Sequence, residues 1–206
     1  PVQLELYENS NLLQSIINKK QGDYAFTALN YSDNYYVKAN KNDDPLNGVT
    51  TADIVKIQKH ILGKESLNSP YLLIAADVNN TKTITASDLS EIRKLILGAI
   101  PQFQKSPSWK FMPEKTDFPD PTYPYDFVSE QKVNLINFQG DAKFRGIKMG
   151  DLNYSALPNG FTNAYSRSIV GLKMGIENVS LASGSAHQIP VYAVGNATLN
   201  SVQFTL

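Results

Sequence analysis

Cysteine is absent from the 206 residues of this chain, which excludes disulfides, thiol chemistry and zinc–thiolate sites. The two histidines, His60 and His187, supply too few imidazoles for a multi-histidine metal site or for ordinary His-dependent catalysis. No apolar run approaches the roughly 20 residues that a membrane-spanning helix needs. The 19 basic residues balance the 19 acidic ones, so the composition argues against nucleic acid or an anionic membrane surface as the main partner.

The chain does contain enough apolar material to bury real cores. Hydrophobic residues make up 42% of it and aromatic residues 10%, more than a disordered tail carries. The length suits one large domain or two small ones. The chain begins Pro-Val-Gln, without a start methionine or a signal peptide, so we expect a processed or excised piece of a longer protein.

The first 40 residues show the period-2 alternation of half-buried strands. The alternation predicts strands near residues 2–6, 22–29 and 35–39, separated by turns rich in asparagine and aspartate. Three short strands are too few to stand alone, so residues 1–40 are predicted to form a partial β-sandwich. The run Gly-x-Tyr-x-Phe-x-x-Leu, followed by Tyr-x-Val, resembles the end of a prealbumin-like repeat of the collagen-adhesin B type. That resemblance implies further strands before Pro1.

Residues 41–100 change to helical periodicity and contain an internal repeat. The segment at 50–63 recurs at 85–98 with a constant offset of 35 residues. The identical positions are those expected to cap the helix, to face its core and to end it. Each copy ends in a glycine, Gly63 or Gly98, where a left-handed residue is easiest. The repeat predicts two helices that share one small core, with these residues on the buried faces: Ile54, Ile57, Ile61, Leu62, Leu89, Ile92, Ile96 and Leu97.

The twelve residues before the second helix have the spacing of a calcium loop. Ca²⁺ takes six to eight oxygens at about 2.3–2.6 Å, and residues 77–88 carry oxygen donors at loop positions 1, 3, 5, 9 and 12. Position 12 is an aspartate where an EF-hand has a glutamate. Position 6, where glycine is preferred for its positive φ, is Lys82, an unfavourable residue. The predicted ligands of this loop are Asp77, Asn79, Thr81, Thr83 and Asp88.

The same count places a first loop at residues 42–53. Its position 5 is Leu46, which has no side-chain oxygen, so we expect either a displaced site that uses Asn47 or Asp43, or a weak one. The alternative is a Thr-x-x-Asp capping box without metal, which is favoured for the first loop alone. The repeat and the ligand frame together favour calcium, with an affinity of about 10⁻⁴–10⁻³ M or somewhat tighter. The predicted ligands are Asn42, Asp44, Gly48, Thr50 and Asp53.

Residues 35–155 resemble a dockerin type I module of the variety embedded in large surface proteins of Bacteroidetes-like bacteria. The resemblance is carried by Pro-Leu-Asn-Gly-Val-Thr-Thr, Ala-Ala-Asp-Val-Asn, Ser-Trp-Lys-Phe, Phe-Pro-Asp-Pro and Lys-Met-Gly-Asp-Leu-Asn. It implies calcium loops that lack an entering helix, and a cohesin as protein partner. The alternative for the partner residues is an ordinary solvated helix face. The resemblance assigns partner contact to Thr51, Ala52, Gln58, Lys59, Ala86, Ser87, Arg93 and Lys94.

Residues 101–158 are rich in proline and aromatic residues, and we expect this segment to wrap over a neighbouring surface. Its acidic residues Glu114, Asp117 and Asp120 lie near aromatic residues, as in a sugar subsite, but packing is the favoured interpretation because nothing fixes two carboxyl groups across a cleft. Residues 151–153 repeat the Asp-x-Asn opening of a calcium loop. Position 12 of that loop would be Thr162, so we interpret them as a turn.

Residues 159–206 return to strand alternation, near 172–176, 189–193 and 202–206. The Ser-Gly-Ser turn followed by Ile-Pro-Val-Tyr resembles the first strands of a cohesin-type jelly-roll. Three strands leave a sandwich open, so we expect both ends of the chain to be completed by strands from outside or from another copy, with self-association as one result.

Together these patterns predict a multidomain, mixed fold. It comprises a partial β-sandwich, an α-helical dockerin-like pair of calcium loops with a Pro/aromatic wrap, and a second partial β-sandwich. No nucleophile–histidine–acid set is recognisable, so we expect no enzyme activity. The predicted function is a calcium-stabilised structural or interaction segment of a large extracellular or cell-surface adhesin, scaffold or filament protein. The alternative is a non-catalytic dockerin-bearing segment of a secreted polysaccharide-degrading enzyme.

Overall fold

The structure, a computed structural model, describes residues 1–18, 23–32, 34–136, 140–158, 173–176 and 191–194. The chain divides into two compact units, residues 1–159 and residues 160–206. Within the described residues, the first unit contains three helices and two antiparallel sheets, and the second unit contains one two-stranded sheet. The expected mixed fold class is confirmed, in that the described residues contain both helices and antiparallel sheets. Among the described helices, none has the length and apolarity needed to cross a bilayer.

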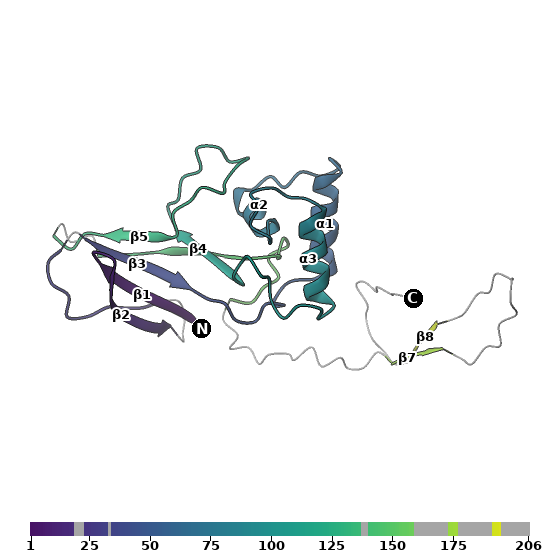
Figure 1. The fold of residues 1–206 in the computed structure, drawn as a ribbon, viewed down its shortest axis with the longest axis horizontal. Coiled ribbons are helices and arrows are strands. Elements are labelled where there is room, and N and C mark those ends of the chain that lie inside the picture. Colours follow the sequence, from purple (N-terminus) through teal and green to yellow (C-terminus); the bar gives the residue numbers. More distant parts are fainter. Residues whose placement is uncertain (19–22, 33, 137–139, 159–172, 177–190, 195–206) are drawn as a thin grey trace, which may run out of the picture. The chain divides into compact units, whose positions relative to one another are not determined.

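A four-stranded antiparallel sheet forms one end of the first unit (Figure 1). Its order is β2-β1-β3-β5, built from β1 (Val2–Glu8), β2 (Asn11–Asn18), β3 (Tyr35–Asn40) and β5 (Glu130–Val133). The hairpin between β1 and β2 turns at Asn9 and Ser10, both with positive φ (47° and 69°), the backbone geometry that matches strand twist in a two-residue turn. One face of the sheet buries Leu4, Leu6, Tyr35, Val37, Ala39 and Val133.

The strands of this sheet differ from the expected ones. Residues 11–18 form β2, which the alternation did not predict, whereas residues 23–29 are not a strand. Both edges of β1 are taken by β2 and β3, and residues 23–29 contact β2 through side chains such as Gln14, which donates to the Thr27 carbonyl. The alternating apolar residues of that segment pack on the buried face of the sheet: Tyr24, Phe26 and Leu29.

The two copies of the repeat form α1 (Thr51–Ile61) and α3 (Ala86–Ile96), which lie side by side (Figure 1). Each helix begins with a capping box and ends before a glycine, and Gly63 and Gly98 have the predicted positive φ (64° and 71°). A further helix, α2 (Pro70–Ala76), was not predicted. It begins with proline at its first position, where the missing N–H leaves no hydrogen bond unmade.

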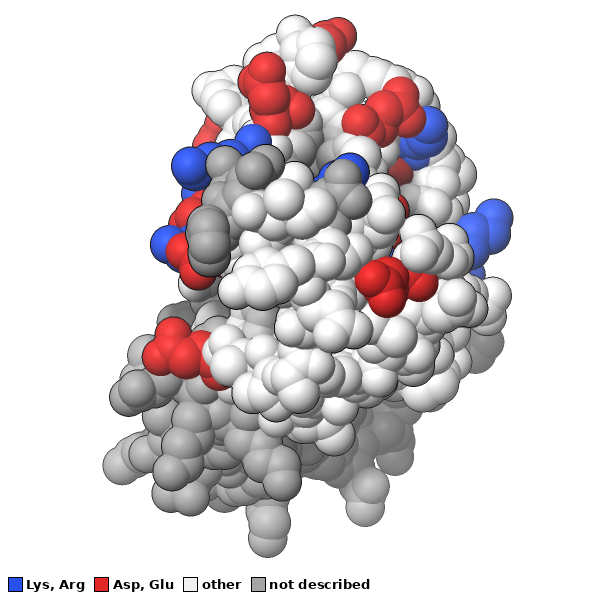
Figure 2. Space-filling view, turned by 90° about the vertical axis from the view of Figure 1, so that its left-hand side faces the viewer, with Lys and Arg blue, Asp and Glu red and all other residues white. Residues whose placement is uncertain are grey.

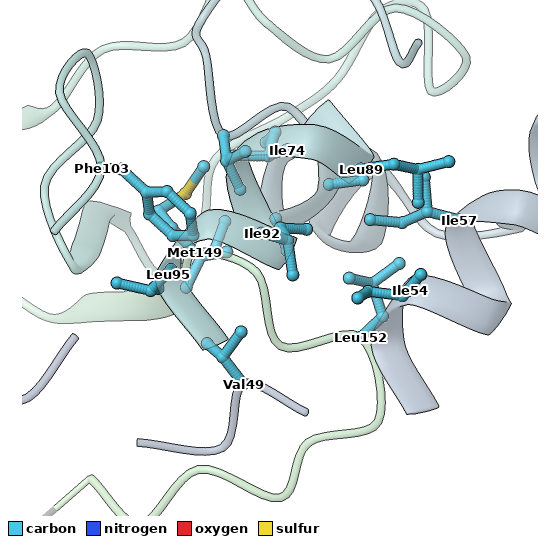
Figure 3. Close-up of a cluster of buried hydrophobic side chains, with 14 of the residues drawn as sticks. Val49, Ile54, Ile57, Ile74, Leu89, Ile92, Leu95, Phe103, Met149 and Leu152 are labelled. Atoms are coloured by element: carbon cyan, nitrogen blue, oxygen red, sulfur yellow. The ribbon is translucent and has the colours of Figure 1, made fainter. Parts of the chain in front are cut away.

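The helices share one core with the segments that follow them (Figure 3). The buried face is shorter than expected, because Ile61, Leu62 and Leu97 are 40%, 62% and 62% exposed. Ile61 is the last residue of α1, and the two leucines are C-cap residues where the chain turns away from the core. The core contains Val49, Ile54, Ile57, Ile74, Leu89, Ile92, Leu95, Phe103, Met112, Met149 and Leu152.

The Pro/aromatic segment joins the helical and strand parts of this unit. Its β4 (Trp109–Pro113) and β6 (Phe144–Lys148) pair with each other, and its β5 pairs with β3 of the first sheet. Phe118 packs edge to face on Tyr71 of α2, with 5.6 Å between ring centroids. The segments that the sequence separates at residues 40 and 100 therefore interlock in one compact unit.

In the second unit, β7 (Lys173–Ile176) and β8 (Val191–Val194) pair in antiparallel fashion. Both strands fall where the alternation predicts strands. The turn at 183–185 and the strand expected at 202–206 lie outside the described residues. The cohesin-like sandwich and its completion by a further strand stay predictions.

Alanine at Ile57 or Ile92 is expected to destabilise the first unit far more than alanine at Leu62 or Leu97. The isoleucines are 0% exposed, so truncation leaves a cavity and should lower the free energy of unfolding by about 2–5 kcal/mol. The exposed leucines should change it by about 0.5 kcal/mol or less. Urea unfolding followed by the fluorescence of the single tryptophan measures both. Equal losses would contradict the assigned buried face.

Candidate metal sites

The loop between α2 and α3 is bounded by two buried aspartates. Asp77 is the C-cap of α2, Asp88 is the third residue of α3, and both are 0% exposed. Asp77 accepts the backbone N–H groups four and five positions later, at 2.9 and 2.8 Å. Asp88 accepts those of Asn79 and Thr85, at 3.3 and 2.9 Å. These bonds curl residues 77–88, here called the continuous loop, around the two carboxylates.

The continuous loop has the left-handed backbone that a calcium loop needs at its sixth position. Lys82 occupies this position with φ 62°, at a cost of about 1–2 kcal/mol for a residue with a side chain. Its ammonium pairs with the carboxylate of Asp126 in the Pro/aromatic segment. The unfavourable residue noted in the sequence therefore adopts the required conformation, with its side chain held by a partner.

The side-chain oxygen of Asn79, at loop position 3, is buried without a hydrogen-bond partner. Leaving such a group unsatisfied costs about 1–3 kcal/mol. No ion pair to a basic side chain is formed by Asp77 or Asp88 within the described part of the chain. Burial raises the pKa of Asp88, and the charge of Asp77 adds to this. Two buried carboxylates and an orphan amide oxygen fit a hard cation such as Ca²⁺.

Side chains from the Pro/aromatic segment, including its strand β4, lie against the continuous loop. Burial raises the pKa of Tyr125 to about 12, and the charges of Asp77 and Asp88 contribute. The ammonium of Lys110 donates to Asn80 Oδ1 at 2.8 Å. Burial lowers the pKa of this amine, and the charge of Asp77 opposes the shift. One basic side chain thus already lies near the first residue of the loop.

In the first loop, the residue predicted at position 1 forms a hydrogen bond outside the loop. The side-chain oxygen of Asn42 accepts the N–H of Ser108 at 2.7 Å, which directs it to the start of β4. Asp53 accepts the N–H of Leu152 at 2.8 Å. Burial raises the pKa of Asp53, and the nearby charge of Asp151 raises it further. The expected position-1 residue is therefore engaged elsewhere, and a different aspartate faces Asp53.

Residues 151–156 together with residues 48–53, here called the split loop, repeat most of the arrangement of the continuous loop. They differ at the sixth position, where Ala156 lacks the positive φ of Lys82. Asp151 is 5% exposed and accepts the backbone N–H groups four and five positions later, at 3.2 and 2.8 Å, as Asp77 does. The residue three positions after the first aspartate has positive φ in both loops. It is Asn80 in the continuous loop (φ 55°) and Tyr154 in the split loop (φ 59°).

A hydroxyl–carbonyl hydrogen bond completes the correspondence. In the continuous loop the Thr81 hydroxyl donates to the carbonyl of Thr83 at 3.3 Å, and in the split loop the Ser155 hydroxyl donates to the carbonyl of Gly48 at 3.0 Å. Each carbonyl lies five residues before the helix aspartate, at the position that supplies a backbone ligand in an EF-hand. Gly48 and Thr50, two of the predicted ligands, thus belong to the split loop, whereas Asn42 does not.

Asp151 is a candidate ligand that the sequence analysis did not identify. Residues 151–153 were interpreted as a turn because the count ran forward to Thr162, whereas the aspartate that they meet lies at the start of α1. A signal was present in the sequence. Asp-x-Asn-x-Thr at 77–81 and Asp-x-Asn-x-Ser at 151–155 share three oxygen donors at the same spacing.

The residues that the dockerin resemblance assigns to a partner lie on α1 and α3, mostly on their outer faces. Thr51 is half-buried, and the other seven are exposed. Lys59 and Lys94 pair with Glu65 and Glu91, and such surface pairs contribute little to stability. This surface is available to a partner and equally suits a solvated helix face.

A cavity of about 810 Å³ lies on the buried face of the four-stranded sheet. Its lining is mainly apolar and includes Glu114, but neither Asp117 nor Asp120 lines it among the described residues. The three carboxylates considered as a sugar subsite are therefore not gathered in one cavity. Elsewhere on the surface, Figure 2 shows acidic and basic side chains around the margins of a broad uncharged area.

Carboxylates alone do not make a complete metal site in either loop. The described residues contain no group of three or more histidine, aspartate or glutamate side chains that could hold one ion, so amide, hydroxyl and backbone oxygens would complete the coordination.

Comparisons with protein-family models, curated proteins and solved structures gave no match. The dockerin resemblance stays a prediction, and the function is argued below from the two loops.

The segment before the split loop is held by a buried lysine. Lys148 of β6 is 4% exposed, and its ammonium donates to the carbonyls of Pro45 and Met149 at 2.7 and 3.3 Å. Burial lowers the pKa of Lys148 to about 8. The negative charges of Asp151, Asp44 and Asp43 raise this pKa, and the positive charge of Lys41 lowers it.

The stability of the protein relative to its Lys148→Met variant is expected to rise with pH between about 8 and 10.5. In this window the unfolded lysine keeps a proton that the folded one has lost, so unfolding is disfavoured as pH increases. Below pH 8 the penalty for burying the ammonium is fully present. Between pH 7.5 and pH 10 the free energy of unfolding of the wild type minus that of Lys148→Met, measured by urea unfolding, should increase by on the order of 1–3 kcal/mol. A constant difference would contradict the lowered pKa.

Proposed function

We propose that this chain is a calcium-stabilised structural segment of a large extracellular or cell-surface protein, such as an adhesin, scaffold or filament component. The observation that carries the proposal is the continuous loop, where buried Asp77, buried Asp88 and the orphan oxygen of Asn79 come together. Among the described residues neither aspartate forms an ion pair, and Lys110 is the basic side chain found near Asp77. When bound, Ca²⁺ supplies compensating charge. A set of oxygen donors without any cysteine favours such a hard cation over zinc.

The split loop supports a second calcium ion. Its donors correspond one for one to those of the continuous loop, and Asp151 takes the place that spacing alone gives to Asn42. The ligands that we propose for this ion are Asp53, Asp151, Asn153, Ser155 and the carbonyl of Gly48.

We assign a structural function to the ions because each loop includes the first turn of a core helix, α1 or α3. The free energy of ion binding at these positions therefore adds to the free energy of folding. Affinities of about 10⁻⁴–10⁻³ M, which few carboxylates per loop favour, are typical of extracellular modules. The proposal includes no catalytic step.

A protein partner of the cohesin type is the second candidate function, in a dockerin-bearing segment of a secreted polysaccharide-degrading enzyme. The observation in its favour is the exposure of Arg93 and Lys94 on α3 and of Gln58 and Lys59 on α1. Calorimetric titration with cohesin domains distinguishes the two. Binding that is lost in an Arg93→Ala/Lys94→Ala variant would favour this second function.

Removing divalent cations is expected to lower the Tm of the first unit. With EDTA the buried carboxylates lose their counter-charge, and the linked binding energy is withdrawn. Differential scanning calorimetry with 5 mM CaCl₂ or with EDTA, roughly five times the weaker expected Kd, measures the shift. An unchanged transition would contradict the calcium assignment and leave the two aspartates as helix caps alone.

The number of bound ions separates the split loop from the spacing-based loop. Calorimetric titration with Ca²⁺ should give two ions for the wild-type chain and one for either Asp88→Ala or Asp151→Ala. Asp44→Ala, which removes a ligand of the spacing-based first loop, should still bind two. If Asp44→Ala loses an ion and Asp151→Ala keeps both, the split loop is wrong and the spacing-based loop is right.

A further inference from the structure

The two loops differ in how their halves are joined. The continuous loop is one run of twelve residues, whereas Leu152 and Asp53, which are bonded across the split loop, stand 99 positions apart in the chain. No short covalent path keeps the two halves of the split loop together. Residues 151–157, here called the strap, therefore need contacts of their own to dock on residues 47–56.

The strap is docked by few but well-placed contacts. At its end, Asn47 and Leu157 exchange two hydrogen bonds, of 2.8 and 3.0 Å. At its start, the ammonium of Lys56 donates to the carbonyl of Leu152 at 3.0 Å, and the Leu152 side chain is fully buried beside Ile54 in the helix core (Figure 3). The strap is thus attached at both ends, with the split loop between them.

Gly48 lies directly against the strap at Ala156. It has φ +76°, and a Cβ built on it would lie 2.5 Å from the amide nitrogen and 2.7 Å from the Cα of Ala156. No side chain fits at this position while the strap is docked. Gly63 has a similar φ, +64°, but a Cβ there would meet nothing within 4 Å. The two glycines share the same backbone requirement and differ in the contact with the strap.

Docking the strap also brings two carboxylates together. Asp53 is 0% exposed and Asp151 is 5% exposed, and neither forms an ion pair with a basic side chain in the described part of the chain. The buried ammonium of Lys148 interacts with the charge of Asp151 but donates its hydrogen bonds to the carbonyls of Pro45 and Met149. Burying like charges near each other is unfavourable unless a cation compensates them. The docked strap is therefore the arrangement that gains most from a bound cation.

We infer that the strap is a calcium-dependent latch, in which docking of residues 151–157 on the start of α1 and binding of Ca²⁺ to the split loop are one coupled equilibrium. This inference rests on the proposed function. By linkage, calcium tightens the strap, and a change that loosens the strap weakens calcium binding by the same factor. The continuous loop lacks this coupling because its ligands are neighbours in the chain. Calcium thereby governs how firmly the chain is held just before residues 160–206.

Hydrogen exchange of the full chain, read by mass spectrometry with 5 mM CaCl₂ and with EDTA, tests the latch. In EDTA the amides of residues 151–157 are expected to exchange at least tenfold faster than with calcium. The amides of β1 and β3, whose buried residues belong to the separate core of the four-stranded sheet, should change little and provide the internal control.

Gly48→Ala, with Gly63→Ala as the matched control, tests the coupling from the other direction. Gly48→Ala should weaken the ion that Asp151→Ala abolishes by at least tenfold and leave the other ion unchanged in calorimetric titration. Gly63→Ala, which imposes similar backbone strain away from the strap, should leave both ions unchanged. If Gly48→Ala does not fold, Asn47→Ala loosens the strap without a clash, with the exposed Asn68→Ala as its control.

The outcomes separate the latch from the proposed function. Two bound ions with strap exchange that is independent of calcium would overturn the latch and leave the proposed function standing. The same conclusion would follow from equal loss of affinity in the Gly48 and Gly63 variants, or from a single ion that Asp151→Ala retains. A chain that binds no calcium would overturn both.

Discussion

A carboxylate buried in a protein interior must have its oxygens satisfied, and two such groups, Asp53 and Asp88, organise the helical part of this chain. Each is the third residue of its helix and accepts the N–H of the N-cap threonine. Each uses its other oxygen to hold an amide of a neighbouring loop. Moving either loop would leave a charge unsatisfied inside the protein. The spacing of α1 and α3, and the core between them, therefore depends on the two loops.

The first unit is held together by segments that are distant in the sequence. β5 completes the sheet by pairing with β3, the strap completes the start of α1, and the N–H of Gly150 donates to the carbonyl of Ala75 at the entrance of both loops. These long-range contacts explain why residues 1–159 form one compact unit although their hydrophobic pattern changes twice along the chain. The two loops are also held together differently. The continuous loop is closed within one stretch of backbone, whereas the split loop is closed by non-covalent docking of the strap.

The Pro/aromatic segment provides the cover that the small helical core needs. Phe118, Tyr125 and Phe127 pack against the core, and Tyr125 lies close enough to the continuous loop for its pKa to respond to both loop aspartates. With this side covered, the outer faces of α1 and α3 are where partner contact is proposed.

The sequence by itself determined the features that arise within a few residues of one another. The Thr-x-x-Asp caps, the stops at Gly63 and Gly98, and the ligand frame of the continuous loop are all local, so their patterns are complete in one stretch of chain. Only the tertiary structure decided that residues 11–18 rather than 23–29 form a strand, because strand pairing depends on which sheet edge is available. It also decided that Leu62 and Leu97 are exposed, since both follow the last turn of a helix. The proximity of Asp53 and Asp151 could not be predicted from a local pattern either. Each half of the split loop carries only part of the proposed ligand set, and folding brings the two halves together.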